Sequence, residues 1–473
     1  MGIIAPELMA RLKAAVGPSG WTDDPAVIAP HLVEERGLYR GNAAFMLRPA
    51  STKAVAAAVG LCAAAKLPIA VQGGNTGLVG GGVPDADGGE VLINLGRMDR
   101  IRAIDRENHT ITVEAGCILA NLQAAAADAG FLFPLSLASE GSCQIGGNLS
   151  TNAGGNAVLR YGSMRDLVLG LEVVLPDGRI WDGMRALRKD NTGYALKQLF
   201  VGAEGTLGII TAAVLKLFPL PKSRATAFVA VRSPAEAVTL LGRARAASSD
   251  LISAFELVPR IGIELVTRHL PGTRDPFAKP YPNYVLIEAT AARDDDGSLR
   301  RGLETLLAEA LADGTALDAV IAASEAQAKL LWKLRDELSP AQKREGACIK
   351  HDVSVPVSSL ADFIRDATQA VTAILPGIRV VAFGHIGDGN VHFNLSQPLG
   401  VDPAAYLARW DEFNRVVHDI TVRMNGSISA EHGIGRLKRA ELAHYRSQTE
   451  IDLMRAIKGA IDPGNLMNPG RIL

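Results

Sequence analysis

Two runs of β-branched and aromatic residues, IRVVAF and VHFNL, flank a glycine-rich stretch, FGHIGDGNVHFN (383–394). The runs have the composition of strands, and the three glycines between them oppose a helix. The pattern predicts a β-hairpin whose turn is centred on Asp388 and Gly389. In that register His385 lies directly opposite His392.

This hairpin predicts half of a metal site. Directly opposed strand residues have Cβ atoms about 5 Å apart, which lets two imidazoles share one metal ion. Asn394 lies two residues beyond His392 and points to the same side. A pair of hydrogen-bonded core histidines is the alternative, favoured where no carboxylate or third histidine joins the pair.

Two further segments carry polar residues at regular spacing. The segment AKLLWKLRDELSPA predicts a helix with Trp332, Arg335 and Ser339 on one face, ended by the Ser-Pro pair. The segment CIKHDVSVPV alternates like a strand, with Lys350 and Asp352 on one face and valines on the other.

Length and composition indicate a soluble globular protein. A chain of 473 residues exceeds one ordinary core and predicts two or more domains. Apolar residues make up 48%, charged residues 21%, and the formal net charge is −1. No basic tract occurs and aromatic residues make up only 5%, so we expect no nucleic-acid partner.

We also expect no membrane span and a cytoplasmic location. The Ala-rich run 54–71 contains Lys66 and Pro68, which favours a helix followed by a strand. The N-terminal MGIIAPELMARLKAAVG predicts a soluble helix and not a secretory signal. The four cysteines lack metal-type or redox-type spacing and indicate a reducing compartment.

Glycines cluster in three long stretches of the first 220 residues: QGGNTGLVGGGVP (72–84), GSCQIGGNLSTNAGGNAVLRYGS (141–163) and NTGYALKQLFVGAEGTLGIIT (191–211). Glycines let backbone N–H groups approach a ligand and cradle a pyrophosphate. None of the stretches matches the Walker or the Rossmann pattern. A different nucleotide cradle is implied.

These glycine stretches, together with FGHIGDGNVHFN, SAEHGIGRLK and the terminal IDPGNLMNPGRIL, resemble a known family. They are similar to FAD-dependent D-2-hydroxy-acid dehydrogenases of the vanillyl-alcohol-oxidase-type flavoproteins, nearest to those that oxidise D-2-hydroxyglutarate. The resemblance runs from about residue 40 to the C-terminus. It implies an α+β fold with a PCMH-type FAD-binding domain (1–220), a substrate or cap domain on an antiparallel sheet (221–425) and a C-terminal segment that completes the active site (426–473).

The resemblance assigns the glycine stretches to FAD. The residues that would bind it are Gly73, Gly74, Asn75, Thr76, Gly77, Leu78, Val79, Gly141, Gly146, Gly147, Ser150, Thr151, Gly154, Gly155, Glu204, Gly205, Gly208, Ile210 and Asn468. Relatives with covalently attached flavin carry a histidine in the first loop, where this chain has Asn75. We therefore expect non-covalent FAD.

The resemblance also completes the metal site. His385, His392 and Glu431 would bind Zn²⁺ or another divalent ion, leaving positions for the substrate hydroxyl and carboxylate. Glu431 follows an expected strand and precedes Gly433, where the chain can turn sharply. His432 would remove the hydroxyl proton while the hydrogen on the same carbon leaves as hydride to flavin N5.

In relatives that oxidise D-2-hydroxyglutarate, an arginine, a hydroxyl residue and a lysine hold the distal carboxylate. Arg335, Ser339 and Lys350 match them, with Ser339 where threonine is expected, and Asn394 is a further substrate-binding candidate. We expect oxidation of D-2-hydroxyglutarate to 2-oxoglutarate through charge-assisted hydrogen bonds to the second carboxylate.

Three alternatives stay open: a D-lactate or glycolate dehydrogenase of the same family, an oxidase, and a non-catalytic flavin-carrying subunit of a larger complex. The metal triad and His432 favour a working enzyme. The chain has no haem or iron–sulfur motif, so an acceptor such as electron-transferring flavoprotein is implied. A homodimer is common among the relatives.

Overall fold

The computed structural model describes residues 4–294 and 296–473. Residues 1–3 and 295 belong to the first and second expected domains but lie outside the described residues. By its contacts the chain forms two compact units. The first contains residues 1–154, 163–220 and 431–473, and the second contains residues 155–162 and 221–430.

Two sheets form the first unit. One has the order β1-β2-β4-β3, in which β4 runs parallel to both β2 and β3, and the other is antiparallel with the order β5-β6-β10-β8-β9. Its elements are α1 (Pro6–Val16), β1 (Trp21–Thr22), α2 (Pro25–Ile28), η1 (Ala29–His31), β2 (Met46–Leu47), α3 (Thr52–Ala65), β3 (Ile69–Gln72), β4 (Val91–Asn94), β5 (Ile101–Asp105), β6 (Thr110–Glu114), α4 (Leu119–Asp128), β7 (Phe131–Leu132), α5 (Ile145–Ser150), α7 (Met164–Leu167), β8 (Val168–Val174), β9 (Ile180–Gly183), α8 (Lys197–Phe200), β10 (Ile209–Lys216), β11 (Phe218–Pro219), α17 (Arg439–Tyr445) and α18 (Gln448–Ile461).

The Ala-rich run folds as its sequence predicts. Helix α3 begins after Ser51, whose hydroxyl accepts a hydrogen bond from the Ala54 N–H, and ends at Lys66 in the left-handed conformation. Strand β3 follows after Pro68. The expected helix followed by a strand is confirmed.

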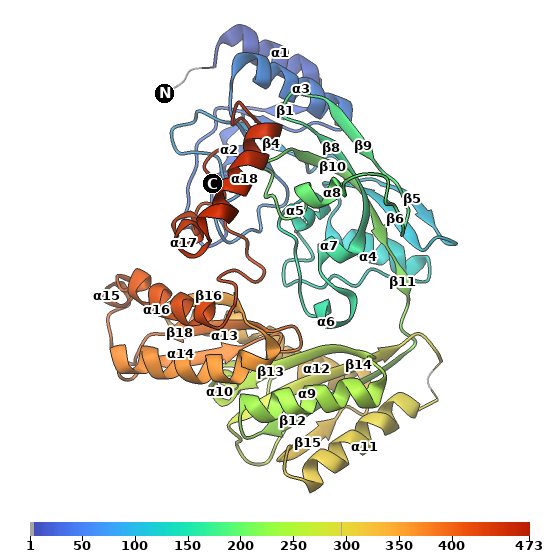
Figure 1. The fold of residues 1–473 in the computed structure, drawn as a ribbon, viewed down its shortest axis with the longest axis vertical. Helices are drawn as coiled ribbons and strands as arrows, with labels where there is room; N and C mark the ends of the chain where they lie inside the picture. The colour runs from blue at the N-terminus through green and yellow to red at the C-terminus, as the bar shows by residue number, and fades with distance from the viewer. Residues whose placement is uncertain (1–3, 295) are drawn as a thin grey trace. The chain divides into compact units, whose positions relative to one another are not determined.

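The C-terminal segment is part of the first unit. An isolated parallel bridge pairs Met467 with Ile69, so the tail extends the β1-β2-β4-β3 sheet beyond β3. Figure 1 shows α18, in red, beside the blue elements of the N-terminal region. Residues nearly 400 positions apart in sequence therefore share one sheet edge.

The second unit is built on antiparallel strands. A four-stranded sheet has the order β13-β14-β12-β15 and a three-stranded sheet the order β16-β18-β17, and a bridge between Leu257 and Gly384 joins them. Its elements are α6 (Val158–Tyr161), β12 (Ser223–Val231), α9 (Pro234–Ser248), β13 (Ile252–Pro259), α10 (Arg260–His269), β14 (Asn283–Ala291), α11 (Ser298–Ala312), β15 (Asp318–Ile321), α12 (Glu325–Asp336), α13 (Leu338–Glu345), β16 (Cys348–Ser354), η2 (Val357–Ser359), α14 (Leu360–Ile374), β17 (Arg379–Phe383), β18 (Asn390–Ser396), α15 (Pro403–Leu407) and α16 (Trp410–Arg423).

The predicted hairpin exists as β17 and β18, but its predicted register is wrong. His392 pairs with Phe383, and the turn is centred on Gly387 and Asp388. The Asp388 carboxylate accepts the Asn390 N–H and closes the turn one residue earlier than expected. His385 therefore lies beyond the end of β17, and its carbonyl accepts the N–H groups of Asp388 and Asn390 in the turn, both at 3.2 Å.

The predicted end of the helix that carries Arg335 is also wrong. Helix α12 ends at Asp336, and Ser339 and Pro340 lie in the first turn of α13. A proline is tolerated there because the first N–H groups of a helix have no intrahelical acceptor. Ser339 thus belongs to a different helix from Arg335.

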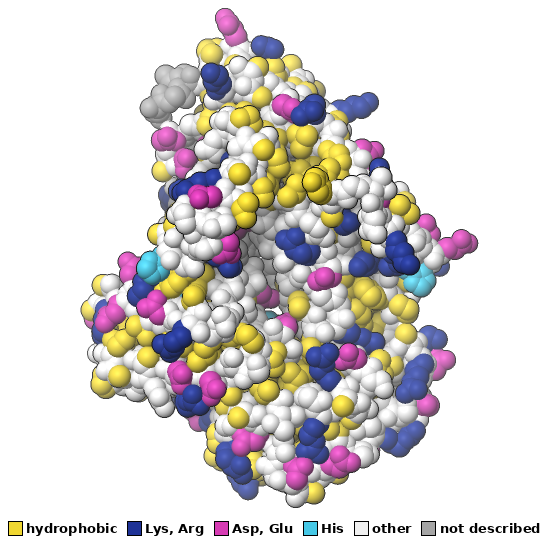
Figure 2. Space-filling view, viewed as in Figure 1, with side chains coloured by type: hydrophobic (Ala, Val, Ile, Leu, Met, Phe, Trp, Pro, Cys, Tyr) yellow, Lys and Arg dark blue, Asp and Glu magenta, His cyan; other side chains and the backbone are white. Residues whose placement is uncertain are grey.

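None of the helices within the described residues combines the length and the apolar character needed to cross a membrane. Figure 2 shows Lys and Arg side chains interspersed with Asp and Glu side chains over the visible face. On this face the positive charge is not gathered in one tract.

Candidate active site

Three predicted metal ligands come together in the structure. One ligand atom from each of His385, His392 and Glu431 lies within 4.8 Å of the other two. The ring centroids of His385 and His392 are 5.4 Å apart and the rings are nearly perpendicular, at 77°. Gly384 allows this arrangement because its φ of 138° lies outside the range that other residues favour. Two imidazoles and one carboxylate suit Zn²⁺ and several other divalent ions.

Glu431 reaches this group through an irregular segment. The expected strand before it is wrong: only Ser427 pairs, in one antiparallel bridge with Ser354 at the end of β16. The Ala430 N–H then donates to the Asp352 carbonyl (3.2 Å), which ties the residue before Glu431 to β16. Gly433 has a φ of 79°, so the expected sharp turn after His432 is confirmed.

A buried carboxylate orients His385. Glu256, in β13, is fully buried and its Oε1 lies 2.7 Å from His385 Nδ1, while its Oε2 accepts from Arg335 Nε at 2.7 Å. Burial opposes ionisation, but the interactions and hydrogen bonds with His385 and Arg335 outweigh it and lower the pKa of Glu256 to about 2. With the carboxylate at Nδ1, Nε2 is the nitrogen that a metal ion would bind, and it lies 3.5 Å from Arg335 Nη2.

His392 has a comparable neighbour across the sheet. In the β16–β18 register Asp352 lies opposite His392, and Asp352 Oδ1 is 3.6 Å from His392 Nδ1. Asp352 is 1% exposed and accepts a hydrogen bond of 2.9 Å from the Asn390 side-chain amide. The polar face predicted from the alternation of β16 is confirmed, and it faces the second histidine.

The substrate-binding candidates form two groups. Lys350 Nζ donates to Ser339 Oγ at 2.9 Å, and Asn394 lies opposite Lys350 in the β16–β18 register. Asn394 is 3% exposed and donates to the Gln342 side chain in α13 at 2.8 Å. Arg335 lies apart from this contact: its guanidinium stacks 5.0 Å from the centroid of the Phe383 ring and is paired with the carboxylate in β13.

The cofactor candidates lie in the first unit and its glycine-rich loops, apart from Gly155 at the start of the second unit. Residues 73–79 connect β3 to the strand β4; Gly141, Gly146, Gly147, Ser150 and Thr151 lie in or beside α5; Gly154 and Gly155 follow α5; Glu204, Gly205 and Gly208 precede β10, which contains Ile210; Asn468 lies in the C-terminal tail.

The first two loops lie against each other. A Cβ on Gly74 would lie 2.2 Å from the Ser142 carbonyl, so only glycine fits there. Asn75 adopts a φ of 55° and its amide donates to the carbonyls of Pro30 and Val33. Its side chain thereby holds the loop in place.

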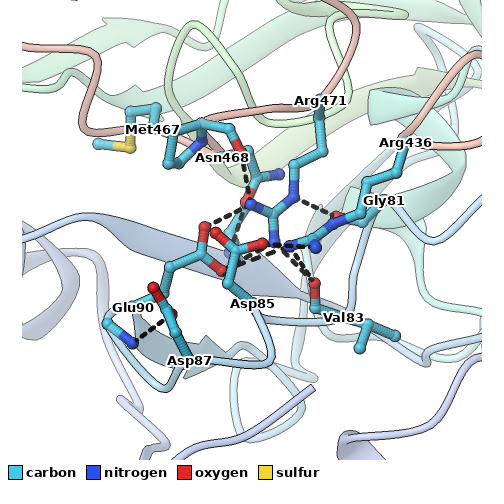
Figure 3. A network of polar contacts seen from close by, with 12 residues as sticks. Gly81, Val83, Asp85, Asp87, Glu90, Arg436, Met467, Asn468 and Arg471 are labelled. Carbon is cyan, nitrogen blue, oxygen red and sulfur yellow. Dashed lines mark hydrogen bonds and ion pairs between the residues drawn. The ribbon is translucent and has the colours of Figure 1, made fainter. Parts of the chain in front are cut away.

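The C-terminal segment also anchors the first loop, through the polar contacts that Figure 3 shows. The buried Arg471 guanidinium donates to both carboxylate oxygens of Glu90 and, at 2.7 Å, to the Val83 carbonyl. Arg436 pairs with Asp85 at 2.5 Å. These two arginines of the C-terminal segment thus tie residues 83–90 to that segment.

Residues 220–472 match the family described as FAD linked oxidases, C-terminal domain, and residues 43–183 match the family described as FAD binding domain. The chain belongs to the FAD-linked oxidase family. It is an FAD-dependent oxidoreductase, as the motifs predict.

Relatives within this family support the same assignment. The chain is 39% identical over 435 residues to a mitochondrial D-2-hydroxyglutarate dehydrogenase of Arabidopsis thaliana, covering 92% of this chain and 76% of the relative. It is 37% identical over 456 residues to a Schizosaccharomyces pombe protein named as a mitochondrial D-lactate dehydrogenase, covering 94% and 85%. Among solved structures, p-cresol methylhydroxylase with bound substrate aligns with a TM-score of 0.76 at 16% identity, covering 98% and 96%. The predicted PCMH-type α+β fold is confirmed.

The FAD expected of a FAD-linked oxidase fits the loops of this chain. Gln144 Oε1 and Asn148 Oδ1 are buried and have no hydrogen-bond partner among the described residues. A Cβ on Gly73 would lie 3.3 Å from Gln144 Oε1, so this unpaired acceptor lies beside the first glycine loop. Unsatisfied buried acceptors are costly, and the hydroxyl and N–H groups of FAD are suitable donors.

Three residues that support the candidate site have no predicted role in it: Glu256, Gln342 and Asp352. Asp352 was placed on the correct strand face without a role. Glu256 carried a detectable signal, because it is the only charged residue in the eight-residue strand ISAFELVP. Gln342 carried none, since an uncharged polar residue in a helix is ordinarily exposed.

Proposed function

We propose that this FAD-linked oxidase oxidises D-2-hydroxyglutarate to 2-oxoglutarate. The observation that carries the proposal is the hydrogen bond from Lys350 to Ser339 in α13. Lys350 lies on the same polar face of the sheet as His392. A lysine placed there can bind a second carboxylate while the substrate hydroxyl lies at the His385, His392 and Glu431 group.

We propose that His385, His392 and Glu431 hold a divalent ion and that the glycine-rich loops hold FAD non-covalently. When bound, FAD supplies a hydride acceptor and the metal supplies a Lewis acid. Asn75 takes the place of the histidine that attaches flavin covalently in some relatives. Glu256 would fix the tautomer of His385 through its contact with Nδ1, and the charge of Asp352, 3.6 Å from His392 Nδ1, would favour the tautomer of His392 that is protonated at Nδ1.

His432 is the proposed base. It follows Glu431 directly, so the metal ligand and the base share one loop. Its imidazole accepts the proton of the substrate hydroxyl, a role suited to a group that titrates near neutrality. Arg335 is proposed as a substrate contact whose charge is balanced by Glu256, so Lys350 is the main source of positive charge for the distal carboxylate.

Oxidation of D-lactate is the second candidate. The Schizosaccharomyces pombe relative is named for that activity, and the pairing of Arg335 with Glu256 reduces the charge available to a second carboxylate. The two candidates share the proposed flavin and metal residues and differ at the distal pocket. A non-catalytic flavin carrier would not need the His385, His392 and Glu431 group.

Anaerobic bleaching of the flavin absorbance by each acid tests the proposal. We expect D-2-hydroxyglutarate to bleach the flavin at low concentration and D-lactate only at much higher concentration. Preferential bleaching by D-lactate would transfer the assignment to the monoacid enzymes. Bleaching by neither acid would contradict the proposed activity.

Replacing Lys350 by Ala should selectively lower kcat/KM for the diacid. The variant loses a charge-assisted hydrogen bond of about 1.5–3 kcal/mol, so kcat/KM for D-2-hydroxyglutarate should fall about 10- to 150-fold. The value for D-lactate should change little. The matched control is Lys343→Ala on the exposed side of α13. An unchanged preference for the diacid in the Lys350 variant would show that the pocket assignment is wrong.

We further propose a separate protein acceptor such as electron-transferring flavoprotein, a homodimer and a cytoplasmic location. All four cysteines are free, which suits a reducing compartment. The two relatives described above carry "mitochondrial" in their names, so fractionation of cells that express the chain is the direct test of location.

A further inference from the structure

The Glu204 carboxylate is directed at the loop that follows His432. Its Oε1 accepts the Ile434 N–H and its Oε2 accepts the Gly435 N–H, both at 2.7 Å. Both oxygens of one buried carboxylate therefore bind consecutive backbone amides. Charge-assisted bonds of this kind are about twice as strong as bonds between neutral groups.

The surroundings of Glu204 leave its carboxylate little freedom. A Cβ on Gly433 would lie 2.7 Å from Glu204 Oε1, and a Cβ on Gly81 would lie 3.5 Å from Oε2. The carboxylate thus lies between the first glycine loop and the loop after His432. Two glycines permit this close approach, as side chains at either position would crowd the carboxylate.

The backbone of Glu204 is held as firmly as its side chain. Its φ of 50° is in the left-handed region, which an ordinary residue adopts only at a cost in free energy. Its carbonyl accepts the Asn468 amide at 2.7 Å, and the other end of that amide accepts the Val71 N–H at 2.9 Å. The tail and β3 therefore fix the residue from which the carboxylate projects.

Two explanations can be given for this carboxylate. The family resemblance assigns Glu204 to the FAD cradle, in which case its removal should weaken FAD binding. The geometry instead directs both oxygens at Ile434 and Gly435, which lie two and three residues after His432. Burial raises the pKa of Glu204, and the two N–H donors partly counter that effect.

We propose that Glu204 is a positioning residue that fixes the loop carrying Glu431 and His432, and that it does so independently of FAD affinity. This inference rests on the proposed roles of Glu431 and His432. A loop held at its Ile434 and Gly435 amides keeps the metal ligand and the base in one orientation. Residues that orient metal ligands typically account for about 10- to 100-fold in metal affinity.

The test is Glu204→Gln in the full chain reconstituted with FAD. The amide oxygen can still accept one N–H, but the amide NH₂ then faces the other N–H, so one bond becomes a contact between two donors. We expect the Zn²⁺ dissociation constant, measured by chelator competition, to rise about 10- to 100-fold. The FAD dissociation constant, measured by flavin fluorescence, should stay within about threefold of the wild-type value, well below that change.

Glu114→Gln is the matched control. It makes the same substitution at a buried carboxylate of the same unit, one paired with Arg100 and Arg102. Both dissociation constants should stay at wild-type values in this variant. Hydrogen exchange of the Ile434 and Gly435 amides should accelerate only in the Glu204 variant.

The outcomes separate this inference from the proposed function. If Glu204→Gln weakens FAD binding and leaves Zn²⁺ binding and amide exchange unchanged, Glu204 is a cofactor-binding residue and the inference is overturned. If Glu431→Gln binds Zn²⁺ as well as the wild type does, the proposed metal site fails. In that case faster exchange at Ile434 and Gly435 would still support the positioning of the loop.

If the Gln variant does not fold, Glu204→Asp serves as the second test of the inference. The shorter side chain keeps the charge but withdraws both oxygens from the two amides. We expect a smaller rise in the Zn²⁺ dissociation constant with FAD affinity retained. Wild-type Zn²⁺ affinity together with wild-type amide exchange in this variant would overturn the inference.

Discussion

Replacing His432 by Asn is expected to lower kcat for D-2-hydroxyglutarate by about 10²- to 10⁴-fold, the usual contribution of a positioned general base. Asparagine keeps a polar side chain of similar size but cannot accept a proton at neutral pH. The neighbouring Glu431 is untouched, so metal content should be retained. Steady-state kinetics with parallel metal analysis and flavin spectra will measure the effect.

The control for this substitution is His444→Asn, which removes an exposed histidine from α17 in the same C-terminal segment. It should leave kcat unchanged. A His432 variant with full metal and flavin content and a kcat within about threefold of wild type, far short of the usual contribution of a base, would exclude the base role. Loss of metal in that variant would instead indicate that His432 is a ligand.

Replacing Glu256 by Gln should destabilise the second unit strongly. The substitution removes the negative charge from a fully buried position and leaves the Arg335 guanidinium, 7% exposed, without its carboxylate. Breaking a buried ion pair by removing one partner typically costs about 3–5 kcal/mol. Urea unfolding followed by tryptophan fluorescence measures this loss, since Trp332 lies in the same helix as Arg335.

Glu288→Gln is the matched control on the neighbouring strand β14. Glu288 is also buried, but its cationic partner Arg224 is half exposed, at 56% of its side chain, and remains hydrated. We expect a loss below about 1 kcal/mol for this variant. The double variant Glu256→Leu with Arg335→Leu should recover part of the stability relative to Glu256→Gln, because the buried guanidinium is removed together with its carboxylate and only the His385 imidazole loses its partner. Equal losses for the two single variants would contradict this account of the ion pair.

The strands of the hairpin and the polar face of β16 could be predicted because each depends on local alternation. The register of the hairpin could not, since it was set by one side chain, Asp388, that closes the turn through the Asn390 N–H. The rings of His385 and His392 meet nevertheless, because Gly384 takes a conformation that redirects the chain. The proximity of the two histidines was thus predicted from an incorrect register.

The long-range contact partners of the predicted residues could not be predicted from the sequence. The contact between Glu256 and Arg335 spans 79 positions, and the contact between Glu204 and Gly435 spans 231. Periodicity describes one helix or strand at a time and carries no information on which distant segment will pack against it. Motif resemblance assigns Glu204 to the flavin cradle, and no motif indicates that its carboxylate also binds the loop after His432.

The insertion of residues 221–430 into the first unit determines the order in which the chain can fold during synthesis. Strand β3 is made early, but its neighbour Met467 and the buried partner of Glu90, Arg471, are made only after the whole second unit. Domains generally fold as they emerge, N-terminal parts first. Here the second unit can complete its folding first, while the glycine-rich loops stay incompletely packed until the C-terminal tail has been synthesised. Such long-range closure slows folding and exposes unpaired strand edges in the interval.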